Sequence, residues 1–78
     1  MEKIYEITKK NGKYIGKKII AKLSTSKEND FNNWLDIRYY YEDKKKKEYL
    51  PTGIGIYLFG EEEINYFIKS IKKLKLIK

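Results

Sequence analysis

The stretch from Trp34 to Tyr41 alternates between two kinds of side chain, as a strand with two different faces does. One set is aliphatic or aromatic and consists of Leu35, Ile37, Tyr39 and Tyr41. The other set consists of Trp34, Asp36, Arg38 and Tyr40. The first set suits a protein core. The second set combines two aromatic rings with the only arginine of the chain, so we expect this face of the strand to bind a ligand.

Two weaker extended patterns precede this strand. Residues 1–10 alternate loosely, and residues 14–26 are rich in isoleucine and lysine. Between them, Asn11-Gly12 is typical of a two-residue hairpin turn, because both positions tolerate positive φ. A polar connection over residues 24–30 follows, and Phe31 stands beside it as an isolated aromatic residue without an evident core role.

The C-terminal part predicts a hairpin and a helix. Residues 42–48 form a charged tip, Pro51-Thr52-Gly53 is typical of a turn, and residues 54–58 form the last strand. Residues 61–76 carry one apolar stripe at helical spacing, made of Ile64, Phe67, Ile68, Ile71 and Leu74. Three glutamates in the first turn and lysines in the last turn favour the helix dipole.

Strands followed by a helix predict an α+β fold, in which the C-terminal helix covers one face of an antiparallel sheet. The other face would stay open to a ligand. The chain of 78 residues makes a single domain, 1–78. Such a short chain has a marginal core, and no cysteine is present to supply a disulfide. We therefore expect a homodimer.

The net charge of +7 suits an anionic partner such as nucleic acid or a membrane surface. Lysine is common here together with isoleucine, asparagine and tyrosine, a bias typical of an AT-rich genome, so Arg38 is more informative than any lysine. No apolar run reaches the roughly 20 residues that span a bilayer, and no signal sequence opens the chain. We expect a soluble intracellular protein that does not enter membranes, and composition does not distinguish nucleus from cytoplasm.

The side chains required for most catalysis are scarce. The chain has no histidine and no cysteine, and Asp36 is best interpreted as an ion-pair partner that orients Arg38. We expect a protein that is not an enzyme and that needs no cofactor or metal. Two features of the sequence each allow two interpretations. The Lys44–Lys47 run is a solvated hairpin tip or a flexible phosphate clamp, and Trp34 stacks on a base or packs under a loop or dimer contact.

Residues 35–43, with the sequence L-D-I-R-Y-Y-Y-E-D, resemble the I-D-I-R-E-Y-aromatic-x-D strand of the transcriptional coactivator positive cofactor four family. Residues 51–58, P-T-G-I-G-I-Y-L, resemble the P-G-x-K-G-I-S-L strand of that family. Ile15-Gly16-Lys17-Lys18 is similar to its first-strand I-G-K signature. The resemblance covers about residues 14–74.

The resemblance implies a strongly curved four-stranded antiparallel sheet (residues 14–58) and a helix (61–76), dimerised through the helices, that binds single-stranded DNA without sequence preference. It implies that Arg38 meets the nucleic-acid backbone, that Lys17 matches a first-strand lysine, and that Phe31 and Tyr41 stack on bases. Tyr41 can join Arg38 only if a bulge or bend interrupts the strand. Ile54 replaces a family lysine, and residues 1–13, which have no counterpart, would add an extra strand or hairpin.

We therefore expect a homodimeric, sequence-nonspecific single-stranded DNA-binding protein that acts in transcription or in DNA replication or repair. The phosphates would be neutralised by Lys17, Lys18, Lys22 and Arg38. The bases would stack on Phe31, Trp34, Tyr40 and Tyr41. Two alternatives stay open: RNA as the natural ligand, because a stacking platform accepts either strand type, and a protein-interaction coactivator module that docks on the transcription or replication machinery.

Overall fold

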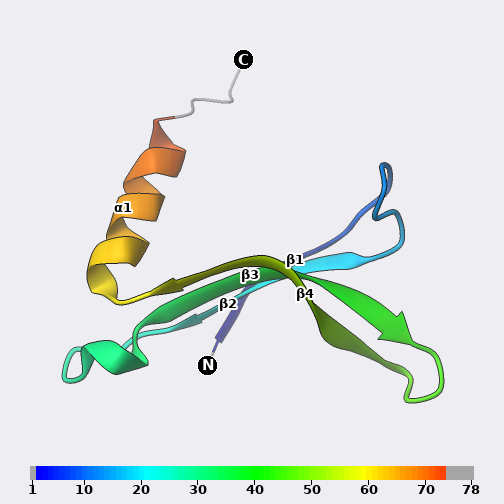
Figure 1. Ribbon diagram of the computed structural model, residues 1–78, viewed down its shortest axis with the longest axis horizontal. Helices are drawn as coiled ribbons and strands as arrows, with labels where there is room; N and C mark the ends of the chain where they lie inside the picture. Colours follow the sequence, from blue (N-terminus) through cyan, green and yellow to red (C-terminus); the bar gives the residue numbers. More distant parts are fainter. Residues whose placement is uncertain (1, 74–78) are drawn as a thin grey trace.

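The computed structural model describes residues 2–73, which form one antiparallel sheet and one helix (Figure 1). The four strands lie side by side in chain order and are β1 (Glu2–Thr8), β2 (Lys18–Ser24), β3 (Trp34–Asp43) and β4 (Glu48–Phe59). The 3-10 helix η1 (Asp30–Asn32) lies between β2 and β3, and α1 (Glu61–Lys72) follows β4. The predicted α+β class, with an antiparallel sheet and a C-terminal helix, is confirmed.

The register of the strands gives the sheet two different faces, because directly opposed residues point to the same side. Ile37 lies opposite Ala21 and Ile56, whereas Arg38 lies opposite Ile20 and Gly55. The aliphatic face carries Tyr5, Ile7, Ile19, Ala21, Leu35, Ile37, Tyr39, Ile56 and Leu58. The aromatic–basic face carries Glu6, Lys18, Ile20, Lys22, Trp34, Asp36, Arg38, Tyr40, Tyr57 and Phe59. The two-faced alternation predicted for the central strand is therefore confirmed.

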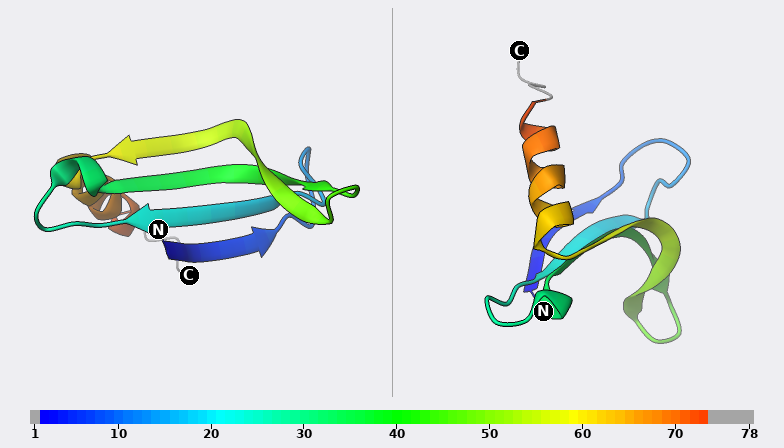
Figure 2. Two further views of the ribbon diagram at one scale, coloured as in Figure 1. Left: turned by 90° about the horizontal axis from the view of Figure 1, so that it is seen from below. Right: turned by 60° about the vertical axis from the view of Figure 1, so that its left-hand side comes forward.

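A wide bulge interrupts β4 opposite the middle of β3. Arg38 pairs with Gly55 and Tyr40 pairs with Pro51, so three residues of β4 face Tyr39 alone. The Thr52 hydroxyl donates to the Tyr39 carbonyl at 2.8 Å and ties the bulge to β3. A bulge bends and twists its strand, and Figure 2 shows the β3–β4 hairpin curling away from the side on which α1 lies. The predicted turn at residues 51–53 is thus an internal bend of a longer strand.

Glycine at position 55 is required by the close approach of β4 to β3. A Cβ atom there would lie 2.3 Å from the Ile37 carbonyl oxygen and 2.5 Å from the Arg38 Cβ. Neither neighbour can move without breaking the strand pairing, because both contacts involve the backbone or the first side-chain atom of β3. The bend of β4 therefore depends on Gly55.

The connection between β1 and β2 is longer than predicted. Lys9 N–H donates to the Lys17 carbonyl at 2.8 Å, which closes a loop over residues 9–17. Gly12 and Gly16 both adopt positive φ, at 89° and 86°, and two successive tight turns run over residues 12–15 and 14–17. The Tyr14 ring packs on the Tyr39 ring of β3, with centroids 4.4 Å apart. The predicted two-residue turn at Asn11-Gly12 and a strand from residue 14 were therefore wrong.

The N-terminal segment is one of the four strands and not an addition to them. The expectation that residues 14–58 hold four strands was wrong, since the turns at residues 12–17 replace strand structure and the bulge keeps residues 48–59 in one strand. The strand predicted within residues 1–13 does exist as β1. It pairs only with β2 and leaves one edge of the sheet open among the described residues.

Helix α1 receives its N-terminal cap from η1. Gly60 precedes the helix and has no side chain that could bond the first-turn N–H groups. Asp30 replaces it, because its Oδ1 accepts a hydrogen bond from Glu61 N–H at 2.9 Å. The side chain of Glu63 reaches back and accepts from Phe59 N–H at 3.0 Å. The helix ends at Lys72, and residues 74–76 of the predicted helix lie outside the described residues.

Helix α1 does not lie across the sheet. Figures 1 and 2 show it rising from the end of β4, and it contacts mainly the ends of β3 and β4. Of the predicted stripe, Ile64 is buried, Phe67 is half-buried, and Ile68 and Ile71 are exposed. The prediction that the helix covers one face of the sheet is therefore wrong for the single chain, because the helix leaves the sheet at a steep angle.

Candidate nucleic-acid interface

Four aromatic rings form a row on the aromatic–basic face at the end of the sheet near η1. The rings belong to Trp34, Tyr57, Phe59 and Phe31, which we call the aromatic row. The Trp34 and Tyr57 rings are stacked with centroids 6.0 Å apart, Tyr57 and Phe59 are 6.5 Å apart, and Phe59 and Phe31 are 5.9 Å apart. Phe31, Tyr57 and Phe59 are 75%, 50% and 41% exposed. The row is therefore an open surface and not a sealed core.

The loop that carries Phe31 is fixed by its own asparagines. The Asn29 side chain accepts from Phe31 N–H at 2.9 Å, and the Asn33 amide donates to Asp30 at 2.9 Å. The hydrogen bonds from Asn33 and then from Glu61 N–H lower the pKa of Asp30 below its usual value of 3.8. Figure 2 shows η1 on the side of the sheet away from α1. The contact of the Phe31 ring with the Phe59 ring joins this loop to the aromatic–basic face.

Arg38 lies at the centre of this face and is held by two partners. Its Nε donates to Asp36 Oδ1 at 2.5 Å, which confirms the predicted ion pair, and its Nη1 donates to the Thr52 carbonyl at 3.0 Å. The hydrogen bond to Asp36 raises the pKa of Arg38 above its usual value. A guanidinium has five N–H donors, so Arg38 can hold the bulge of β4 and still present donors to a phosphate.

The lysines of the same face lie over tyrosine rings. Lys22 Nζ is 5.3 Å from the centroid of the Tyr40 ring, and Lys18 Nζ is 4.4 Å from that of Tyr49. Such cation–π contacts hold an ammonium in place while leaving it charged. Within residues 2–73 Lys22 forms no ion pair, so its charge stays available to an anionic ligand.

Lys18, in contrast, already has a carboxylate partner. Glu6 bonds Lys18 and Lys3 at 2.5 Å each. The hydrogen bonds from Lys18 and then from Lys3 lower the pKa of Glu6 from 4.5 to about 2, and Glu6 in turn raises the pKa of Lys18. Glu6 therefore neutralises part of the basic surface at this end of the face, and a phosphate would have to share Lys18 with it.

Three of the residues predicted to bind are not on the open part of this surface. Lys17 lies in the loop before β2, where its carbonyl accepts from Lys9. Tyr40 is only 7% exposed, and the ammonium of Lys22 lies over its ring. Tyr41 pairs with Leu50, and unbroken alternation of β3 points it to the side of Tyr39. The bulge lies in β4 and not in β3, so the expectation that a bend brings Tyr41 beside Arg38 was wrong.

The other predicted residues are brought together. Phe31 and Trp34 belong to the aromatic row, while Lys18, Lys22 and Arg38 lie on the same face of β2 and β3. The prediction overlooked Tyr57, which was assigned to a short apolar strand over residues 54–58, and Phe59, which follows that strand. A signal was present, since both rings alternate with Ile56 and Leu58, the residues that lie opposite the aliphatic positions of β3.

The lysine-rich hairpin tip lies at the opposite end of β3 and β4 from the aromatic row. Asp43 Oδ1 accepts from Lys45 N–H at 3.0 Å and Lys46 N–H at 3.2 Å, and Lys47 adopts a positive φ of 56°. The four lysine side chains are exposed. This geometry fits a solvated tip as well as a mobile phosphate clamp.

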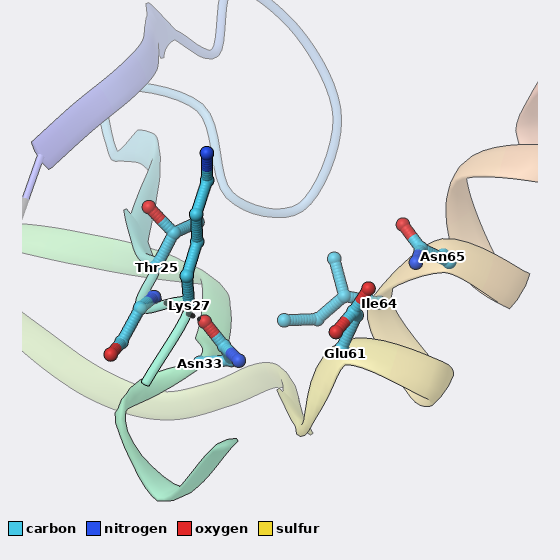
Figure 3. Close-up of a pocket in the computed structure, with 7 residues that line it drawn as sticks. Thr25, Lys27, Asn33, Glu61, Ile64 and Asn65 are labelled. Atoms are coloured by element: carbon cyan, nitrogen blue, oxygen red, sulfur yellow. Dashed lines mark hydrogen bonds between the residues drawn. The ribbon is translucent and has the colours of Figure 1, made fainter. Parts of the chain in front are cut away.

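A separate hollow of about 350 Å³ lies between the β2–β3 connection and the first turn of α1. Figure 3 shows Thr25, Lys27 and Asn33 on one side of it, with Glu61, Ile64 and Asn65 on the other. Asn33 is occupied by structural bonds, because its Oδ1 accepts from Ser26 N–H and its Nδ2 donates to Asp30. The hollow shares no residue with the aromatic row. We interpret it as part of the contact region between α1 and the β2–β3 connection.

Within residues 2–73 no group of three or more acidic, histidine or cysteine side chains is arranged to hold a metal ion. No helix in that range has the length and apolar character needed to cross a membrane.

Comparison with known proteins finds no similarity that identifies a relationship: no protein-family model, no curated protein and no solved structure matches this chain. The resemblance to the positive cofactor four family therefore depends on the motifs of residues 15–18, 35–43 and 51–58 alone. Function has to be inferred from the surface itself.

Proposed function

We propose that this protein binds single-stranded DNA through the aromatic–basic face, without sequence preference and without catalysis. The observation that supports this most is the continuity of the aromatic row with Arg38 and Lys22 on one face of the sheet. Aromatic rings stack on any base, and cations beside them neutralise the backbone, which is the combination that binds single strands. Duplex DNA would not fit as well, since its bases are already stacked on one another.

The electrostatics favour the same ligand class. The chain has a net charge of +7, and among the cations of the sheet face Lys22 and Arg38 flank the aromatic row. Each phosphate that they neutralise releases counterions, so affinity should depend strongly on salt. A protein of this kind would act where strands are separated, in transcription, replication or repair.

The homodimer belongs to the same proposal. Ile68 and Ile71 extend an exposed apolar stripe along α1, and the aliphatic face of the sheet leaves Ile7 and Ile56 exposed. A twofold dimer buries the same patch on both copies. Helix–helix pairing would cover both apolar surfaces and leave the aromatic–basic face of each copy open.

RNA remains the alternative ligand, because stacking on the aromatic row does not depend on the sugar. A protein-interaction module on the same fold is the second alternative, and the exposed aliphatic face is the observation that favours it. Such a module would bind a protein partner through this face, and the binding would survive high salt and nuclease treatment.

The proposal is tested by titrating fluorescein-labelled (dT)20 with the full chain and following fluorescence anisotropy. We expect the single strand to bind more tightly than a 20-base-pair duplex, and unlabelled (dT)20 to compete at least as well as (rU)20. Better competition by (rU)20 would identify RNA as the ligand. Equal affinity for duplex and single strand would contradict the proposal.

A further inference from the structure

Tyr57 and Phe59 stand at alternate positions of β4, on the face of the sheet opposite the aliphatic one. Their neighbours Ile56 and Leu58 lie opposite Ile37 and Leu35 on the aliphatic face. Tyr57 and Phe59 point to the other side and are 50% and 41% exposed. An exposed strand face ordinarily carries polar or β-branched residues, so two adjacent exposed rings indicate a binding role.

We propose that Tyr57 and Phe59, together with Trp34, form a base-stacking subsite that holds consecutive unstacked bases of the single strand. This inference rests on the proposed function and adds residues to it. Trp34 and Tyr57 form one stacked pair, and Phe59 contacts Phe31 at the outer end of the row. Tyr57 and Phe59 present exposed surfaces against which a base can stack, and Trp34 beside them is half-buried.

The spacing of the rings determines how far apart consecutive bases of the bound strand lie. Neighbouring centroids in the row lie 5.9–6.5 Å apart, whereas stacked bases rise by only about 3.4 Å along a strand. Bases that follow the row are therefore pulled apart from one another, and ring–base contacts replace base–base stacking. A stretched strand of this kind is incompatible with a duplex.

The charges around the row orient the strand. Asp30 and Glu63 lie at its outer end, where they bond Glu61 N–H and Phe59 N–H respectively. Their negative charge disfavours phosphates there. Arg38 and Lys22 lie toward the centre of the sheet, on the same face, where Asp36 lies opposite Lys22 and forms an ion pair with Arg38. The bases would thus lie over the row while the backbone runs along the side of the lysines and Arg38.

The inference is tested with the full chain and two labelled strands of 20 nucleotides, (dT)20 and a strand whose nucleotides are all abasic. The abasic strand keeps the phosphates and removes the stacking partners. Tyr57→Leu and Phe59→Leu should each raise the Kd for (dT)20 by about 5- to 150-fold, which corresponds to roughly 1–3 kcal/mol per stacked base. Neither variant should change the Kd for the abasic strand by more than about twofold.

Two further variants separate stacking from other effects. Tyr57→Phe keeps the ring and should bind (dT)20 as the wild type does, which excludes a role that depends on the hydroxyl. Tyr66→Leu removes a tyrosine that is 73% exposed on α1 and should leave both affinities unchanged. Circular dichroism of each variant checks that the sheet is retained.

Trp34 supplies a second readout, because it is the only tryptophan in the chain. Its emission should be quenched by (dT)20 and not by the abasic strand. The inference is overturned if the wild type binds (dT)20 and the two leucine variants bind it equally well, a result that leaves the proposed function standing. A wild type that binds neither strand would overturn both.

Discussion

Arg38 Nη1 donates a hydrogen bond to the backbone carbonyl of Thr52, 3.0 Å away across the bulge of β4. Arg38, the main candidate for phosphate binding, therefore also stabilises the bend of the sheet. A loss of binding in an Arg38 variant has two possible causes, and the choice of substitutions has to separate them.

Replacing Arg38 by alanine and by lysine separates charge from structure. Arg38→Lys keeps the positive charge, but one ammonium cannot reproduce the paired bonds to Asp36 and Thr52. We expect it to preserve the salt dependence of binding and to lower the free energy of unfolding by about 1.5–3 kcal/mol, the usual contribution of charge-assisted hydrogen bonds. Arg38→Ala should lose the same stability and also one phosphate contact. Urea unfolding, followed by the emission of Trp34, measures the loss of stability. Titrations at several salt concentrations measure the loss of the phosphate contact.

A lysine of the hairpin tip provides the control for Arg38. Lys45→Ala should change neither the unfolding free energy nor the affinity by a comparable amount, because its side chain is exposed far from the aromatic row. A reduction in affinity equal to that of Arg38→Ala would show instead that the tip acts as a phosphate clamp.

Gly55→Ala should destabilise the sheet. The added Cβ would lie 2.3 Å from the Ile37 carbonyl oxygen, and overpacking of this kind costs about 1–3 kcal/mol. Gly53→Ala is the matched control, since its Cβ would meet no atom within 4 Å. The midpoint of urea denaturation should be lower than in the wild type for Gly55→Ala only. Equal stability of both variants would mean that β4 does not approach β3 as closely as described.

Glu6 should oppose nucleic-acid binding. Glu6→Gln frees Lys3 and Lys18 from their carboxylate, so we expect a lower Kd for (dT)20 and a steeper salt dependence than in the wild type. Anisotropy titration at two salt concentrations measures both. An unchanged Kd would indicate that Lys18 lies outside the path of the strand.

The pH dependence of stability gives an independent check on Glu6. Its pKa is lowered to about 2 in the folded chain from 4.5, so the folded state favours the charged carboxylate. This contribution to stability is present above about pH 4.5 and is lost as the pH falls toward 2. The wild type should therefore lose more of its stability than Glu6→Gln between these pH values, as measured by urea unfolding at each pH.

Dimerisation should depend on the exposed stripe of α1. Ile68→Asp and Ile71→Asp each place a charge on that stripe, and light scattering should show a mass near 9.4 kDa in place of twice that value. Tyr66→Asp introduces the same charge on the other side of the helix and should remain dimeric. A wild type that is monomeric at high concentration would refute the dimer.

Much of the fold was predictable because it follows local patterns. Alternation defined the two faces of β3, and apolar spacing defined α1 from residue 61 onward. The route of the chain between elements depended on long-range contacts instead. The turns at Gly12 and Gly16 are accompanied by packing of Tyr14 on Tyr39, and the cap of α1 comes from Asp30, thirty-one positions away. Local sequence patterns do not predict such long-range contacts.

The same distinction applies to the site. Phe31, Trp34 and Arg38 were predicted as candidate binding residues because each is unusual in its local context. Tyr57 was overlooked because an apolar strand explains an aromatic residue equally well until its register is known, and Phe59 was overlooked because the strand was expected to end at residue 58. Only the pairing of Ile56 with Ile37 assigns the remaining rings of β4 to the opposite face.

If the aromatic–basic face binds single strands through stacking and phosphate neutralisation, the affinity for (dT)20 must depend on salt in a defined way. We predict a linear fall of log K with log salt, with a slope of about −0.7 for each phosphate neutralised and thus roughly −1.4 to −2.8 for two to four phosphates. A substantial affinity should remain at high salt because stacking does not depend on counterions. A slope near zero, or no measurable binding at low salt, would show that this face does not bind single-stranded DNA in this way.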